Sequence, residues 1–212
     1  MNPGRRTALL LAAVLVVLAG TTLAVGLQAN ASGPCTGPRW PVKTLADPAA
    51  QYVDRVPAKD TVAGLAALTP HAVNASSARQ TQVETRLRTV SVELVAGKLV
   101  HDGDLQLVVR DPGGQATMIA EFPDATCLAK GVSGPDRAAM GAARGALQRT
   151  CPTFGPTNRP LTGRAVLTGV QFHDTPHAGD TEADNARGAA PDEIELHPVL
   201  AVTDLTCAAG RA

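Results

Sequence analysis

The side chains best suited to acid–base or metal chemistry gather near the carboxyl end of this 212-residue chain. Two apolar stretches, residues 164–172 and 193–202, have the composition of β-strands and flank a polar, glycine-rich connection. The connection begins with His173 and Asp174 and continues to His177. We therefore expect a hairpin whose loop carries imidazole and carboxylate groups.

The second of these strands carries two more such groups. Strand alternation places Ile194, Leu196 and Leu200 on one face and Glu195 and His197 on the other, outward face. Three of the five histidines of the chain thus fall within this one hairpin. Taken alone, Glu195 and His197 would also fit an ordinary surface or cross-strand pair.

A second acidic group lies in the turn HDGD, where Asp102 and Asp104 flank a glycine. Two acids in a turn are usually solvated, so these acids belong to a site only if the fold brings them close to the hairpin. Carboxylates with neutral imidazoles suit Zn²⁺ or Mn²⁺, and carboxylates alone suit Ca²⁺ or Mg²⁺. The candidate metal ligands are Asp104, His177, Glu195 and His197. The wider candidate binding set is Asp102, Asp104, His173, Asp174, His177, Glu195 and His197.

The segments around these residues are predicted to be strands and one helix in a defined order. Residues 83–100, 105–110 and 117–122 alternate as strands, with Gly97 predicting a bend in the first. The segment SGPD at 133–136 has the spacing of a capping box, which predicts a helix to about residue 150. The chain from 83 to 207 therefore reads as three strands, a helix and two strands.

This order is that of the OB-fold, a five-stranded barrel, and an open α+β sheet is the alternative. OB-folds bind ligands on strands two and three and on the loops between strands one and two and strands four and five. Those loops here are 101–104 and 173–192, which carry the acids and histidines. We expect a mainly β fold with one or two short helices and a binding rim at these loops.

The residues before the barrel predict an export segment and an arm. Residues 1–31 combine a basic start, an apolar run over 7–27 and an A-x-A site, as in a signal peptide, although the run is almost long enough for an uncleaved membrane anchor. Residues 32–82 read as an irregular arm with a short helix after Asp60 and a linker at 71–82. The expected location is secreted or extracytoplasmic, with membrane contact only through 7–27.

Four cysteines in an exported chain predict disulfides, because thiols outside the cytoplasm are normally oxidised. Of the three pairings, we favour Cys127 with Cys151, which bracket the predicted helix, and Cys35 with Cys207, which would join the chain ends. Free buried cysteines remain the alternative. Zinc binding by these cysteines is disfavoured because neither CxxC nor close Cys/His spacing occurs.

Charge and motifs exclude several classes of function. Residues 1–31 hold two of the 19 basic residues and none of the 19 acidic ones, so the remainder has 17 against 19. This balance offers no general attraction for nucleic acid, and an aromatic content of 2% offers few stacking platforms. Signatures of a GxSxG nucleophile or a phosphate-binding P-loop are absent from the sequence.

Several separated motifs resemble an uncharacterised family of exported bacterial proteins. They are RWPVKT at 39–44, HDGD at 101–104, TMIAEFPD at 117–124, and TGV followed by FHDTPH and IELHPVL. The resemblance implies secretion and an OB-type barrel, and it implies no activity. Gln106 stands where the resemblance leads us to expect His, and an extra acidic stretch, TEADNARG, lengthens the last loop. The first departure removes one metal or proton ligand.

The sequence leaves three hypotheses. The first is a non-enzymatic binding module for an unknown ligand or cell-envelope partner, which binds at loops 101–104 and 173–192. The second is a metal-assisted hydrolase, phosphodiesterase- or nuclease-like, whose cation activates water. The third is an anchored structural protein, if 7–27 stays attached. A divalent cation is the one cofactor that these residues suggest.

Overall fold

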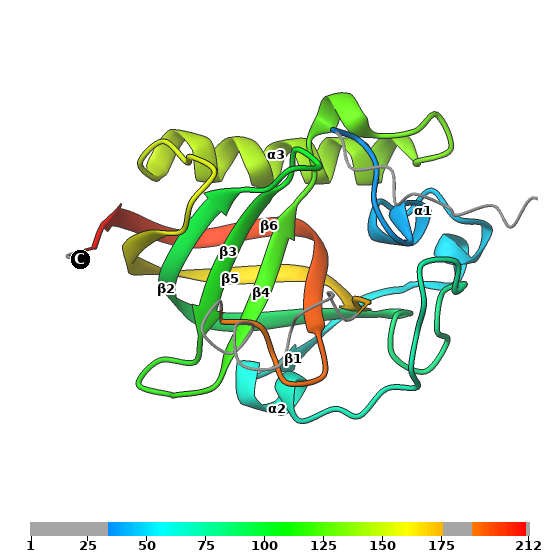
Figure 1. Ribbon diagram of the computed structural model, residues 1–212, viewed down its shortest axis with the longest axis horizontal. Coiled ribbons are helices and arrows are strands. Elements are labelled where there is room, and N and C mark those ends of the chain that lie inside the picture. The colour runs from blue at the N-terminus through cyan, green and yellow to red at the C-terminus, as the bar shows by residue number, and fades with distance from the viewer. Residues whose placement is uncertain (1–33, 176–187, 211–212) are drawn as a thin grey trace, which may run out of the picture.

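The computed structural model describes residues 34–175 and 188–210 and shows a mainly β chain whose sheet closes into a ring (Figure 1). The strand order is β1-β2-β3-β4-β6-β5, and β2 also pairs with β5, so that five strands form the ring and β1 lies outside it. The strands are β1 (Asp54–Asp60), β2 (Arg86–Leu99), β3 (Leu105–Arg110), β4 (Thr117–Phe122), β5 (Arg159–His173) and β6 (Ile194–Ala209).

Strand β2 pairs with β5 on one edge and with β3 on the other. The parallel strand β1 covers the first part of the edge that β3 leaves. The register of β2 shifts just before Ala96, next to the bend predicted at Gly97. A Cβ at Gly97 would lie 2.5 Å from the ring of Phe154, so a side chain would not fit there.

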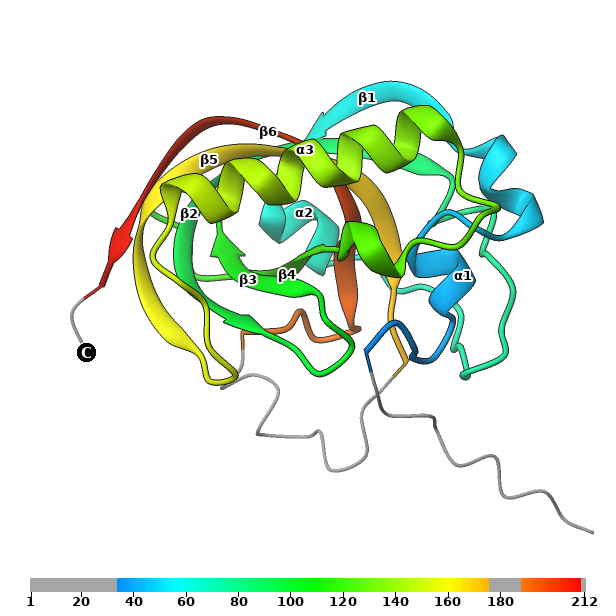
Figure 2. The same ribbon diagram turned by 90° about the horizontal axis from the view of Figure 1, so that it is seen from above.

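The inside of the ring is apolar, and two helices close it. Alternate residues of the strands point inward, among them Leu107, Phe122 and Leu196. Helix α3 (Gly134–Thr150) lies along one side of the ring and contributes Leu147, while α2 (Val62–Ala66) contributes Leu65 (Figures 1 and 2). The inward positions of β3, β4 and β6 therefore carry the core, and their outward positions are available for other roles.

The predicted helix at 133–150 is confirmed, including its cap. The Ser133 hydroxyl accepts a hydrogen bond from the backbone N–H of Asp136, and Cys151 follows the last turn. The two hairpin strands are longer than predicted, since β5 begins at Arg159 and β6 continues to Ala209. Their outer parts contain the alternation-breaking Gly163 and a run of half-exposed residues, which hid them in the sequence.

The arm is more ordered than its composition suggests. It contains α1 (Trp40–Lys43), a 3-10 helix η1 (Pro48–Tyr52) and the strand β1, which the sequence did not predict because six of its seven residues are exposed. Helix α2 follows Asp60 as expected, but Thr61 is its N-cap. Within the predicted linker, Arg79 is buried.

Both predicted disulfide pairings are wrong. Cys35 bonds to Cys127 and Cys151 bonds to Cys207, and the structure describes no free cysteine. Cys127 is the last residue of the short 3-10 helix η2 (Ala125–Cys127), which lies between β4 and α3. The first bond therefore ties the arm to the ring instead of joining the chain ends. The second bond joins the end of α3 to β6.

Two disulfides fit an oxidising, extracytoplasmic environment, as the sequence predicts. Among residues 34–175 and 188–210, no helix has the length and apolar character needed to cross a membrane. The predicted export segment, residues 1–31, lies outside the described residues.

Candidate functional site

The site lies on the outer face of the ring, beneath the arm. On β6, Ile194 and Leu196 belong to the apolar core, so Glu195 and His197 face away from it. The pairing of Ile119 with Glu195 across the β4–β6 ladder brings Glu121 to the same face. Four acidic or imidazole side chains from three segments meet there, and we call Asp104, Glu121, Glu195 and His197 the carboxylate–histidine cluster.

The outward face predicted for Glu195 and His197 is buried, with an exposed fraction of 0% for His197 and 3% for Glu195. The alternation holds for Ile194 and Leu196, whereas Leu200 packs against a second buried cluster. The arm is held over this face by the Cys35–Cys127 bond and by a hydrogen bond from the Cys35 N–H to the Asp102 carbonyl. An outward position of the ring thus becomes an interior position of the molecule.

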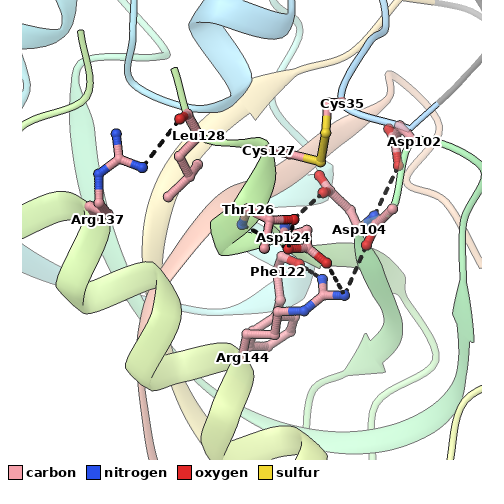
Figure 3. Close-up of a disulfide and its surroundings, with 11 residues drawn as sticks. Cys35, Asp102, Asp104, Phe122, Asp124, Thr126, Cys127, Leu128, Arg137 and Arg144 are labelled. Atoms are coloured by element: carbon pink, nitrogen blue, oxygen red, sulfur yellow. Dashed lines mark hydrogen bonds and ion pairs between the residues drawn. A yellow bond between two sulfur atoms is a disulfide. The ribbon is translucent and has the colours of Figure 1, made fainter. Parts of the chain in front are cut away.

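The turn that carries Asp104 is held by Arg144 and by the backbone of Asp124 (Figure 3). Arg144 of α3 donates hydrogen bonds to the carbonyls of Phe122 and Gly103 and to the carboxylate of Asp124. The Asp124 backbone N–H donates to Asp104 Oδ1 at 3.1 Å. One oxygen of Asp104 is therefore fixed in the turn, and the other is left for the cluster.

Glu121 is held in the same way. Gln106, its cross-strand neighbour, donates a hydrogen bond to Glu121 Oε1 at 2.8 Å. Each of these two carboxylates thus has one oxygen bound by the protein and one directed at His197.

His197 lies between the carboxylates. Its Nε2 lies 3.2 Å from Asp104 Oδ2, and its Nδ1 lies 2.9 Å from Glu121 Oε2 and 3.6 Å from Glu195 Oε2. The Phe172 ring packs edge-on against the imidazole, with centroids 5.6 Å apart. These distances allow charge attraction, but the contacts do not have the directions of hydrogen bonds.

Five buried polar atoms of the cluster consequently have no hydrogen-bond partner among the described residues. They are Asp104 Oδ2, Glu121 Oε2, Glu195 Oε2, His197 Nδ1 and His197 Nε2. Folded proteins leave few such atoms, and each costs roughly 1–3 kcal/mol. A concentration of five in one place marks this cluster as a candidate functional site.

The electrostatics of the cluster follow from this crowding. Burial, followed by the charge of Glu121, raises the pKa of Glu195 to about 8. Burial also opposes the charge on Glu121, but His197 and Lys43 outweigh it and lower the pKa of that carboxyl to about 2. Burial opposes the charge on His197 as well, and Glu121 and Asp104 outweigh it and hold the pKa well above its ordinary value.

Lys43, from α1, brings a buried positive charge to the edge of the cluster. Its Nζ lies 3.0 Å from Asp174 Oδ2 and 5.5 Å from the centre of the Phe172 ring. Burial opposes its charge, but the carboxylates of Asp174, Glu121 and Glu195 outweigh that effect and raise the pKa of Lys43. The arm therefore contributes chemistry as well as cover.

A cavity of about 290 Å³ opens beside the cluster. Its walls come from the arm, from the turn before β3, from the outer faces of β3, β4 and β6, and from the residues that flank 176–187. The acidic residues on its walls are Asp102, Glu121, Asp174, Glu193 and Glu195, and the basic ones are Lys43, Lys98 and His101. Burial, with the charges of Asp104 and Glu121, raises the pKa of Asp102 to about 6.

A second buried charged group lies under the same arm. Both terminal nitrogens of Arg39 donate to the Glu84 carboxylate, at 2.7 and 2.6 Å, and further donors reach the carbonyls of Ser77, Ala78 and His173. Glu84 also accepts from the backbone N–H groups of Gln80 and His173. This Arg39–Glu84 pair, fully buried, has partners for all of these atoms.

The structure sorts the predicted site residues accordingly. Asp104, Glu195 and His197 are brought together, and Asp102 and Asp174 line the adjacent cavity. His173 is instead placed beside Glu84 and Gln80, where burial lowers the pKa of its imidazole. His177 lies outside the described residues.

Sequence reasoning missed Glu121 and Lys43. Glu121 is a single acid inside the apolar strand MIAEF, at a position where alternation points away from the core. The available signal was an acidic residue in an otherwise apolar strand. Lys43 had none, because its position depends on how the arm folds back over the ring.

Asp104, Glu121 and His197 can each offer one ligand atom, and these atoms all lie within 4.8 Å of one another. Within the described part of the chain they are the only group of this kind. Comparisons of the chain with known protein families, curated proteins and solved structures found no match.

Proposed function

We propose that this chain is an extracytoplasmic binding module built on an OB-type barrel, and that the cavity under the arm binds a small, positively charged ligand. The observation that carries the proposal is the charge of the cavity wall. Five acidic side chains face it, of which Glu195 alone has a pKa raised to about 8, against two lysines and the exposed His101. A cation is the ligand that such a wall stabilises.

The arrangement of elements supports the OB assignment. A closed ring with a helix between its third and fourth strands has the connectivity expected of that fold, with β1 as an addition. The cavity lies at the loops where OB-folds bind, since it is lined by Asp102 before β3 and by Asp174 after β5. The resemblance to exported bacterial proteins points to the same fold, and a cell-envelope partner is compatible with it.

The proposal is tested by thermal unfolding of the purified exported chain against a panel of small ions. Diamines, basic amino acids and amino sugars are the cationic arm, and citrate and phosphate are the anionic arm. We expect a saturable rise in melting temperature with at least one cation, lost in Asp102→Asn and kept in the matched variant Asp192→Asn, whose carboxylate is exposed outside the cavity. Stabilisation by the anions alone would contradict the proposal.

A second candidate, a metal-assisted phosphodiesterase, is favoured by one observation, the contact of His197 with two buried carboxylates. A cation held there would lower the pKa of bound water and generate a nucleophile. The acidic wall disfavours a phosphate substrate, which places this function second. Hydrolysis of bis(p-nitrophenyl) phosphate by the zinc- or manganese-loaded protein, abolished by His197→Gln, would reverse the order.

A further inference from the structure

We propose that the inner end of the cavity is a divalent-metal centre in which Asp104, Glu121 and His197 supply the ligand atoms. This inference rests on the proposed function, because it names the class of cation that the cavity binds. The directions in which these side chains are held support the proposal.

In both Asp104 and Glu121, one carboxylate oxygen is hydrogen-bonded and the other is not. Asp104 Oδ1 accepts from the Asp124 N–H, and Glu121 Oε1 accepts from Gln106, so both carboxylates are fixed in direction. The remaining oxygens, Asp104 Oδ2 and Glu121 Oε2, are buried and lack hydrogen-bond partners among the described residues, and both point at His197. Preorganised ligands on rigid strands are what a metal centre requires.

The distances between the candidate ligand atoms can be compared with those around a bound metal ion. Donor atoms bound about 2.0–2.2 Å from a tetrahedral ion lie roughly 3.3–3.6 Å from one another. Glu121 Oε2 lies 2.9 Å from His197 Nδ1, whereas Asp104 Oδ2 lies 3.2 Å from Nε2, the other ring nitrogen. One ligand atom from each of the three residues nevertheless lies within 4.8 Å of the other two. An ion bound to one ring nitrogen would therefore need the carboxylate at the other nitrogen to turn toward it.

The neighbours of the centre fit the same interpretation. Phe172 packs on the imidazole and fixes its plane, and Glu195 lies 3.6 Å from His197 Nδ1, where it can orient the ring or bind the ion as a further ligand. Metal-bound histidines commonly have a carboxylate in such a role. Because Glu121 and Glu195 also line the cavity, the ion would keep a coordination position open toward it.

The donor set indicates which metals to expect. One imidazole with two carboxylates suits Zn²⁺ or Mn²⁺, whereas Ca²⁺ and Mg²⁺ prefer sites made of oxygen alone. The competing occupant is a proton, which would make His197 an imidazolium between carboxylates. Occupation by a metal ion predicts stoichiometric metal binding by the cluster, and occupation by a proton does not.

The experiment is calorimetric titration of the EDTA-stripped, dialysed exported chain with ZnCl₂ and MnCl₂. We expect one equivalent to bind with a saturable isotherm, and Glu121→Gln and Asp104→Asn each to weaken binding by about 100-fold or more. The matched control Asp192→Asn should bind as the wild type does. Circular dichroism confirms that each variant is folded.

Cobalt spectroscopy keeps the test valid if a variant does not fold. Co²⁺ added to the wild-type chain should give visible d–d bands that Zn²⁺ removes, with His71→Gln as a control that retains them, since His71 is exposed. No saturable binding up to millimolar Zn²⁺ and Mn²⁺, or equal affinity in Glu121→Gln, would overturn the metal centre. If organic cations still stabilise the chain in EDTA, that failure concerns the metal alone, and if they do not, the proposed function fails with it.

Discussion

Two groups of buried charges lie under the same arm, and they differ in how completely their atoms are paired. In the Arg39–Glu84 pair the guanidinium and both carboxylate oxygens are matched by charge and by hydrogen bonds to backbone. In the carboxylate–histidine cluster five buried atoms have no hydrogen-bond partner within the described residues. The first group is complete without a ligand, and the second is not.

The comparison separates a structural role from a binding role. A buried ion pair that is fully hydrogen-bonded fixes the arm to the ring, as the hydrogen bond from Arg39 to the carbonyl of His173 at the end of β5 shows. In the cluster, by contrast, one oxygen each of Asp104 and Glu121 is hydrogen-bonded and the other only faces His197, and buried polar atoms without hydrogen bonds oppose folding. Burial alone would not have distinguished the two groups.

The largest effect should come from breaking the complete pair. Glu84→Gln leaves the Arg39 charge buried without a counter-charge, and we expect it to lower the free energy of unfolding by about 3–5 kcal/mol. Urea denaturation followed by circular dichroism measures it. The matched variant is Glu93→Gln, whose exposed pair with Arg110 should be worth under about 1 kcal/mol. Equal losses in the two variants would remove the distinction between them.

The two disulfides should differ in function and not in stability. Replacing Cys35 and Cys127 by Ser, or Cys151 and Cys207 by Ser, should each lower stability by about 2–4 kcal/mol, because each bond closes a long loop. The first replacement alone should weaken cation binding, since the Cys35–Cys127 bond holds the arm over the cluster. Calorimetry on both double variants measures this. Equal affinities would show that the arm stays in place without its bond.

An added ligand beside the cluster should raise its affinity for zinc. Gln106 lies on the cavity wall and contacts Glu121. The substitution Gln106→His places an imidazole beside the proposed ligands, and we expect it to tighten zinc binding by about tenfold, or about 1.4 kcal/mol. Thr89→His, outside the cavity, is the control and should leave the affinity unchanged. Weaker binding in Gln106→His would mean that its hydrogen bond to Glu121 matters more than an added ligand.

The smallest effect on folding should come from the incomplete cluster. Glu195→Gln replaces a buried carboxyl group whose pKa is raised to about 8 and whose Oε2 lacks a hydrogen-bond partner among the described residues, so the metal-free variant should stay within about 1 kcal/mol of the wild type or exceed it. Urea denaturation in EDTA, alongside Glu84→Gln, gives the comparison in one experiment. A loss as large as that of Glu84→Gln would place Glu195 in the structural class.

The strands and the main helix could be predicted from the sequence because their signals are local. Alternation located β3 and β4 within their observed bounds, and the Ser133 capping box located the start of α3. Alternation also placed Glu195 and His197 on a common face away from the core, which is correct. Strand β1 was missed because it is exposed and pairs along only part of β2.

The site itself could be predicted only in part, because its burial depends on long-range contacts. The arm that covers it is held by the Cys35–Cys127 bond, and four cysteines do not reveal their connectivity. His173 and Asp174 are adjacent, yet only Asp174 reaches the cavity, while His173 serves the Arg39–Glu84 pair. Sequence proximity therefore grouped residues that the fold separates.

The most direct test of the account is anomalous diffraction from crystals of the protein grown with Zn²⁺ or Mn²⁺. We expect a single strong peak among Asp104 Oδ2, Glu121 Oε2 and a ring nitrogen of His197, at bonding distance from all three. Density that shows those atoms paired only with one another or with water, under saturating metal, would contradict it.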